Sequence, residues 1–314
     1  MIHAIGYAGI CLGLPERSIT RTARLRNATP DRLRELIDAN LTDLHAILEY
    51  NVQNRFCLFR INQDIIPFSS HPVNTLHWWE DDEFGPLLRW NGAYVREHCL
   101  RVSMHPGQYT VLNSLNPAVV ESSLAEVSAT CRILDTMGLP PMHKIVIHGG
   151  AGQPNGAAAL ARLEEVWPRI PEHVRVRLVL ENDDKVFSAD QLLPVCRRLG
   201  APMVFDWLHH RALPGAWGAR PIRDILAEVF TTWCPHDGPP KVHFSSQDPA
   251  KRSGAHAYGL DPDDFLTFHR ILDPFVVDVM AECKGKDLAL RQLREELGWT
   301  SLDCGESPWH GNAA

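Results

Sequence analysis

The chain has 314 residues, 45% of them hydrophobic, and a net charge of −7 at pH 7. That length suits one α/β barrel, and the negative charge argues mildly against a nucleic-acid partner, although it averages over all faces of the molecule. No run of about 18 apolar residues predicts a membrane span, and the start lacks the basic-then-apolar pattern of a signal peptide, so we expect a cytoplasmic protein.

Strand-like apolar runs alternate with amphipathic segments along the whole chain. The predicted strands are 2–7, 56–61, 100–104, 144–148, 176–181, 202–206, 241–245 and 275–282. The predicted helices are 29–51, 84–97, 117–137, 155–169, 188–199, 220–232, 261–273 and 285–298. Eight such units without a separating linker predict a single (β/α)8 TIM barrel over 1–298. The tail, 299–314, is expected to be loosely ordered.

Eight cysteines are scattered along the chain, and none form a C-x-x-C pair. In a chain of this length, such scatter indicates reduced, mostly buried thiols. It argues against a disulfide framework and against a cysteine zinc site.

Six successive predicted strands end at or run through a side chain that can bind a metal ion. These residues are His105, His148, Glu181, Asp206, His243 and Glu282. The active sites of TIM barrels lie at the C-terminal ends of the strands. One histidine at a strand end is commonly an ordinary rim residue, but six potential ligands on six successive strands predict a metal site.

Three further histidines extend this ligand set. His209 forms a D-x-x-H pair with Asp206, His256 lies in the loop after the seventh strand, and His71 follows the second strand. Imidazole and carboxylate without thiolate suit Mn²⁺, Zn²⁺ or Co²⁺, with Mg²⁺ also possible, rather than Ca²⁺. Nine ligands exceed the needs of one ion, so two or three ions are predicted. Clustered divalent ions favour phosphodiester hydrolysis.

Two basic loops would share a face with these ligands. Arg17 and Arg21 follow the first strand, and Lys251 and Arg252 follow the seventh. Such residues either form a solvated surface or contact phosphates, and their position on the ligand face favours phosphate contact. Metal-dependent sugar isomerases of the xylose-isomerase type also hold ions in barrels, so metal chemistry alone leaves that alternative open.

A series of motifs in fixed order is more specific. It consists of "FRINQDIIPFSSHP", "VSMHPGQYTVLN", "IVIHGGA", "LVLENDD", "FDWLHH", "KVHFSS" and "AECKGKD". Over roughly residues 1–298 the chain resembles the UV damage endonucleases (UVDE), TIM-barrel repair nucleases related to endonuclease IV. The resemblance implies a metal-dependent enzyme, generally with manganese, that acts on damaged double-stranded DNA. It would cut directly 5′ of pyrimidine dimers, photoproducts and sometimes abasic sites, leaving 3′-hydroxyl and 5′-phosphate ends. We expect it to act as a monomer.

The resemblance also assigns roles to individual residues. As metal ligands it implies His71, His105, His148, Glu181, Asp206, His209, His243, His256 and Glu282. Among these, Glu181, Asp206 and His243 are expected to be catalytic, together with Lys241.

Lesion contacts are implied as well. Gln108 and Tyr109 would probe the duplex opposite the lesion, and Tyr7 matches an aromatic residue near the lesion pocket. The alternative for both tyrosines is core packing. Cys11 stands where relatives often have asparagine, which is a departure from the family pattern. A non-catalytic lesion-binding protein is a second rival, but the full ligand set argues against it.

Lys241 lies two residues before His243 on the same strand, so both side chains should point into the barrel. An ammonium beside divalent ions is disfavoured, and burial further penalises its charge. Lys241 could therefore be neutral, pair with a carboxylate, or react with CO₂ to form an anionic carbamate. The resemblance supports a modified lysine.

Overall fold

Eight parallel strands close into a barrel in the order β1 to β8, with β1 paired to β8. The computed structural model describes residues 1–17, 21–107, 109–153 and 155–299. The strands are β1 (Ile2–Gly9), β2 (Leu58–Ile61), β3 (Arg101–Met104), β4 (Ile145–His148), β5 (Leu178–Glu181), β6 (Met203–Asp206), β7 (Lys241–Phe244) and β8 (Val277–Ala281). The predicted TIM barrel is therefore confirmed.

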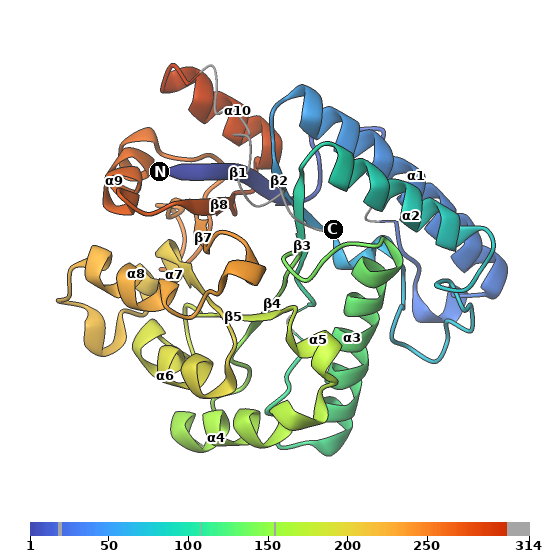
Figure 1. Cartoon of the computed structure of the whole chain (residues 1–314), viewed down its shortest axis with the longest axis horizontal. Helices are drawn as coiled ribbons and strands as arrows, with labels where there is room; N and C mark the ends of the chain where they lie inside the picture. Colours follow the sequence, from blue (N-terminus) through green and yellow to red (C-terminus); the bar gives the residue numbers. More distant parts are fainter. Residues whose placement is uncertain (18–20, 108, 154, 300–314) are drawn as a thin grey trace.

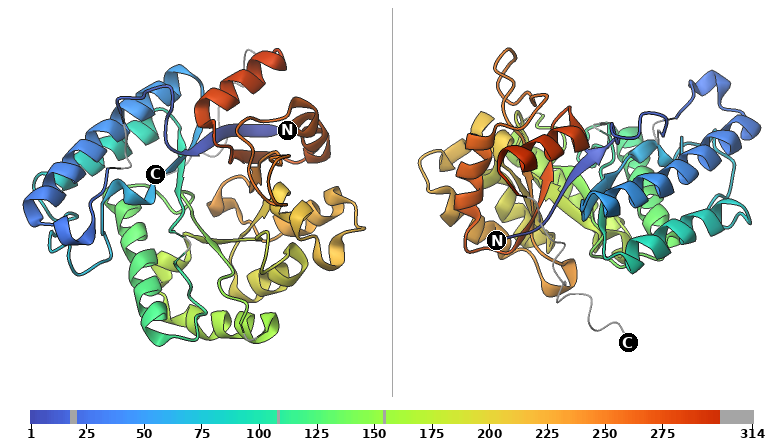
Figure 2. Two further views of the ribbon diagram at one scale, coloured as in Figure 1. Left: turned by 180° about the vertical axis from the view of Figure 1, so that it is seen from behind. Right: turned by 90° about the horizontal axis from the view of Figure 1, so that it is seen from above.

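Helices surround these strands, as Figures 1 and 2 show from three directions. The main helices are α1 (Pro30–Gln53), α2 (Phe84–Glu97), α3 (Pro117–Thr136), α4 (Gly156–Val166), α6 (Ala189–Leu199), α8 (Ile222–Phe230), α9 (Pro262–Leu272) and α10 (Lys286–Glu296). The short helices α5 (Glu172–Arg175) and α7 (Trp207–Ala212) were not predicted. Within the described ranges, no helix combines the length and the apolar character that crossing a membrane requires.

The first helix begins as its sequence predicts. The Thr29 side chain accepts a hydrogen bond from the Arg32 amide, and Pro30 occupies the first turn. The apolar stripe of α1, which includes Leu33, Leu41 and Leu48, is fully buried. This packing fixes the outer layer against the strands.

The inside of the barrel combines small apolar side chains with buried charges. Val146, Val179 and Val204 pack in one cluster, while Ala4 and Ala8 of β1 pack in another. Two buried ion pairs lie among the strands and the loops beneath them, and these are Arg101–Asp278 at 2.6 Å and Lys144–Asp237 at 2.5 Å. Alternation along each strand sends every second residue to this interior.

The seven cysteines within the described residues follow the expectation with one exception. Cys11, Cys131, Cys196 and Cys283 are buried free thiols, whereas Cys99 and Cys234 are exposed. Cys57 is disulfide-bonded, so the expectation of reduced thiols is wrong at that position.

Gly6 allows β1 and β2 to approach each other. A β-carbon at this position would lie 1.5 Å from the Leu58 carbonyl oxygen. We predict that Gly6→Ala lowers the free energy of unfolding by about 3 kcal/mol or more, because the strands must separate. Urea unfolding measures the change. The control is Gly259→Ala, since no neighbouring heavy atom lies within 4 Å of the added carbon. Equal stability of both variants would contradict the close approach.

Candidate metal centre

The carboxylate of Glu181, at the end of β5, lies at the centre of the candidate site. Only 1% of this residue is exposed, and four histidine nitrogens surround it. They are His243 Nδ1 at 2.7 Å, His105 Nε2 at 3.5 Å, His209 Nδ1 at 3.6 Å and His148 Nε2 at 3.9 Å. Burial opposes the charge, but His243 and His148 hold the pKa of Glu181 well below its usual value.

Asp206 and His209 form the second part of the site, where β6 ends and α7 begins. Asp206 is fully buried, and burial raises its pKa to about 6. Burial lowers the pKa of His209, but the carboxylates of Asp206 and Glu181 overcome this and raise it to about 9. The D-x-x-H spacing works because Asp206 also accepts the His209 amide at 2.7 Å and so caps α7.

The ligand atoms of these residues converge. Three groups have donor atoms within 4.8 Å of one another: His105–His148–Glu181, Glu181–Asp206–His209 and Glu181–His243–Glu282. His256 extends the set, because its ring lies 5.7 Å from that of His209. The structure therefore brings together eight of the nine predicted ligands.

Main-chain carbonyls orient three of the imidazoles. In each case Nδ1 donates to a carbonyl oxygen, and the pairs are His105–Pro106 at 2.9 Å, His209–Asn182 at 2.9 Å and His256–Glu282 at 2.5 Å. A carbonyl can only accept, so the proton must reside on Nδ1. Nε2 then remains available as the ligand atom. Histidines that bind a metal commonly donate their other ring N–H to a carbonyl or carboxylate in this way.

Buried oxygens without partners indicate that these residues fit divalent cations. Asp206 Oδ2 and Glu181 Oε2 are inaccessible and accept no hydrogen bond within the described part of the chain. Leaving such atoms unsatisfied is unfavourable unless a cation binds them. Together with the imidazoles they form the nitrogen and oxygen donor set of a Mn²⁺-type or Zn²⁺-type site.

Arg60 also enters the site, although it was not among the residues predicted from the sequence. It lies on β2 and is 8% exposed. Its Nη2 lies 2.5 Å from Glu282 Oε1 and 2.9 Å from His243 Nε2. The available signal was an arginine within an apolar strand, because alternation directs such a residue either to solvent or into the barrel.

Lys241 is fully buried in the barrel, as predicted. Its Nζ makes no hydrogen bond to any described residue, so the predicted alternative of pairing with a carboxylate is wrong. Burial, followed by the charges of Arg101 and Arg60, lowers the pKa of Lys241 well below its usual value. A neutral amine or a carbamate remains.

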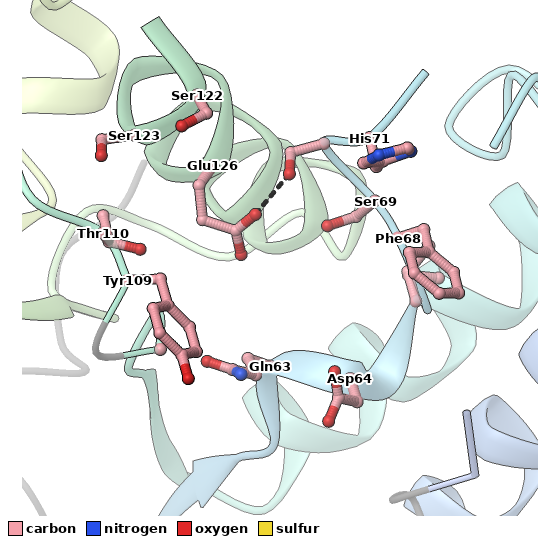
Figure 3. A pocket seen from close by; sticks show the side chains of 13 residues that line it. Gln63, Asp64, Phe68, Ser69, His71, Tyr109, Thr110, Ser122, Ser123 and Glu126 are labelled. Carbon is pink, nitrogen blue, oxygen red and sulfur yellow. Dashed lines mark hydrogen bonds between the residues drawn. The ribbon is translucent and has the colours of Figure 1, made fainter. Parts of the chain in front are cut away.

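His71 does not join the cluster. It is exposed in the loop after β2, where its Nδ1 accepts a hydrogen bond from the Val73 amide at 3.0 Å. It lines a neighbouring cavity of about 270 Å³, together with Tyr109 and Glu126 (Figure 3). The turn engages only Nδ1 of His71, so its role as a ligand stays a prediction.

The predicted lesion-contacting residues have different surroundings. Tyr109 is 82% exposed at the edge of that cavity (Figure 3). Tyr7 is fully buried, and its hydroxyl donates to Asn51 Oδ1 at 2.7 Å, as in the core-packing alternative. Gln108 lies outside the described residues.

Of the predicted phosphate-contacting residues, Arg17, Lys251 and Arg252 are exposed and Arg21 is half-buried, and all four form ion pairs. Arg17 and Arg21 both pair with Asp43 of α1, Arg17 at 3.2 Å. The other pairs are Lys251–Asp248 at 3.6 Å and Arg252–Asp184 at 2.5 Å. The carboxylate partners are poorly solvated, because the side chains of Asp43, Asp184 and Asp248 are only 4%, 15% and 18% exposed. Breaking these pairs is therefore unfavourable, and a phosphate would bind the N–H donors that each arginine or lysine does not use for its carboxylate.

Fold and site together define a TIM barrel with a candidate metal centre at its mouth. The profile of the UV-endonuclease UvdE family matches residues 14–303, and the chain belongs to this family. It is 33% identical over 287 residues to a UV DNA damage endonuclease of Clostridium perfringens, covering 91% of this chain and 68% of that protein. It is 32% identical over 306 residues to one of Bacillus cereus strain G9842, covering 95% of each.

Solved structures agree with this assignment. The crystal structure of SacUVDE is similar with a TM-score of 0.86 and 34% identity, covering 94% of this chain and 99% of that one. Endonuclease IV from Thermus thermophilus gives 0.55 and 17% identity, covering 81% of this chain and 94% of that one. The latter likeness shows the fold alone. The chain is thus a TIM-barrel nuclease of the UV DNA damage endonuclease family.

Proton release should accompany metal binding. His209 has a pKa of about 9 in the metal-free protein, so it is protonated at about pH 7.5, whereas a ligand must be neutral. We predict that Mn²⁺ binding releases about one proton at this pH and that the release disappears as the pH rises through about 9. Calorimetry in buffers of different ionisation enthalpy measures it. Release that persists unchanged above this pH would contradict the assignment.

Proposed function

We propose that the protein hydrolyses the DNA phosphodiester immediately 5′ of UV photolesions, with two or three divalent ions, generally Mn²⁺. The cluster of imidazoles and carboxylates around the buried Glu181 carries this proposal. Water adds to phosphorus and the bond from phosphorus to the 3′ oxygen breaks, which leaves 3′-hydroxyl and 5′-phosphate ends. Ions held by this cluster would activate water and neutralise the reacting oxygens.

The chain's own residues bind and orient the substrate. Phosphates would contact the exposed Arg17, Lys251 and Arg252 and the half-buried Arg21. Tyr109, with its ring exposed, is suited to stack against bases opposite the lesion. A damaged dinucleotide stacks poorly, so extruding it costs less than extruding normal bases. We expect a monomer that acts in the cytoplasm, with access to the chromosome.

A sugar epimerase is the main rival. Epimerases share this fold at low identity, for example 3-keto-D-glucoside 4-epimerase from E. coli with a TM-score of 0.53 and 12% identity. An exposed aromatic ring and basic loops suit a duplex better than a small sugar. A non-catalytic lesion-binding protein has no use for buried carboxylate oxygens without partners.

An irradiated, end-labelled duplex tests the proposal. With Mn²⁺ the purified protein should nick the strand directly 5′ of a cyclobutane dimer, and a chelator should stop the reaction. Unirradiated duplex is the control. Intact irradiated duplex together with turnover of a ketose would favour the epimerase instead.

Two carboxylate variants test the metal centre. Glu181→Ala and Asp206→Ala should reduce nicking to background, because each removes a central ligand, while the fold is retained. Circular dichroism checks the fold, and the surface variant Glu164→Ala, which removes only an exposed ion pair with Arg198, is the matched control. Near-normal nicking by either variant would exclude that residue from the centre.

Lesion discrimination should depend on Gln108 and Tyr109. Replacing both with alanine should bring the affinity for damaged duplex close to that for intact duplex, because the inserted side chains hold the lesion extruded. The matched control is Trp90→Ala, an aromatic on α2 that is 47% exposed. Fluorescence anisotropy measures both affinities. An unchanged preference would leave the two residues as ordinary rim residues.

Lys241 is proposed to carry a carbamate. Its unpartnered neutral amine would add to CO₂ and release a proton, giving an anion beside the ions instead of a cation. Electron density beyond Nζ, and a bicarbonate dependence of nicking that Lys241→Arg abolishes, would support this. A bare lysine in a well-resolved, metal-loaded crystal structure would exclude it.

A further inference from the structure

Lys286 has an unusual backbone conformation at the start of α10. Its φ of 49° lies in the left-handed region, which side chains other than glycine rarely adopt. Such strain persists only where the surroundings enforce it, and it concentrates at functional sites. The position therefore calls for a reason why lysine, and not glycine, occupies it.

Both neighbours of Lys286 are fixed by hydrogen bonds. The Gly285 amide donates to the Tyr258 carbonyl at 2.7 Å. The buried carboxylate of Asp287 accepts the Leu12 amide at 2.6 Å and the Gly13 amide at 2.9 Å. The start of α10 is thereby anchored to the loops that follow β7 and β1. This anchoring holds Lys286 in its strained conformation.

Lys286 lines the cavity at the mouth of the metal centre. This cavity of about 460 Å³ is also lined by Arg60, His105 and His148. The Lys286 ammonium forms no hydrogen bond or ion pair with the described residues, while the charges of Glu282 and Arg60 are near enough to act on it. Lys286 is thus an unpaired cation beside the candidate ligands, unlike the ion-paired Lys251 and Arg252.

We propose that Lys286 binds a non-bridging oxygen of the scissile phosphate and stabilises the charge that develops there during hydrolysis. This inference rests on the proposed nuclease function. An ammonium is a compact point charge with donors that suit a phosphoryl oxygen, and a fixed donor at the reacting group stabilises the transition state more than the ground state. Lys286 transfers no proton in this scheme.

Replacing Lys286 with glycine distinguishes a role in binding phosphate from a purely structural role. If Lys286 served only the fold, Lys286→Gly would be harmless or favourable, because glycine adopts this φ without strain. We therefore expect Lys286→Gly to keep or raise the melting temperature while it slows nicking. Lys286→Met, which keeps the aliphatic stem, should slow nicking to the same degree.

The experiment measures single-turnover nicking of a dimer-containing duplex by the Mn²⁺-loaded protein. Lys286→Met and Lys286→Gly should lower the rate about 100- to 1,000-fold with unchanged manganese content. The salt dependence of duplex binding should lose about one phosphate contact. The matched control is Lys284→Met, two residues away, where the side chain is 45% exposed and pairs with Asp248 at 3.2 Å. It should react close to the wild-type rate.

The possible failures can be told apart. If wild-type protein does not nick the duplex, the proposed function fails. If wild-type protein nicks and the Lys286 variants match Lys284→Met, the function stands and this inference is overturned. Loss of bound manganese in the Lys286 variants would also overturn it, since Lys286 would then act on the metal centre rather than on the phosphate.

Discussion

The arrangement of the mouth depends on one buried charge, the carboxylate of Glu181. A carboxylate that is 1% exposed is strongly disfavoured without partners. Four imidazoles within 3.9 Å supply them and hold its pKa low. Because each imidazole comes from a different part of the barrel, the same interaction that stabilises the charge also fixes the positions of the candidate ligands.

Charge in the barrel is arranged around this centre. Arg101 and Lys144 are each matched by an aspartate, and Arg60 lies against Glu282 and His243 at the mouth. Lys241 is the buried lysine that no described residue pairs with. The barrel therefore combines a candidate cation site, rich in carboxylates, with an amine that is stable there only if it loses its charge or becomes an anion.

Much of this site followed from the sequence because parallel strands bring their C-terminal ends together. That geometry converts six strand-end residues into one cluster without any knowledge of loops. The sequence could not show that His71 lies outside this cluster, because its position depends on a loop turn that engages its Nδ1. Side chains alternate along β1, and Ala4, Gly6 and Ala8 face the inside of the barrel. This pattern could have predicted that Tyr7 faces the surrounding helices and is buried in the layer between strands and helices. The position of Lys286 could not be predicted from the sequence, because it depends on hydrogen bonds that its neighbours Gly285 and Asp287 form with distant loops.

Anomalous diffraction from crystals of the Mn²⁺-loaded protein tests the metal centre most directly. Data collected on either side of the manganese absorption edge locate the ions independently of activity. We predict two or three peaks among the imidazoles and carboxylates around Glu181, with Asp206 Oδ2 and Glu181 Oε2 bound to ions. Fully loaded crystals without a peak in this cluster, or with peaks only at surface carboxylates, would contradict it.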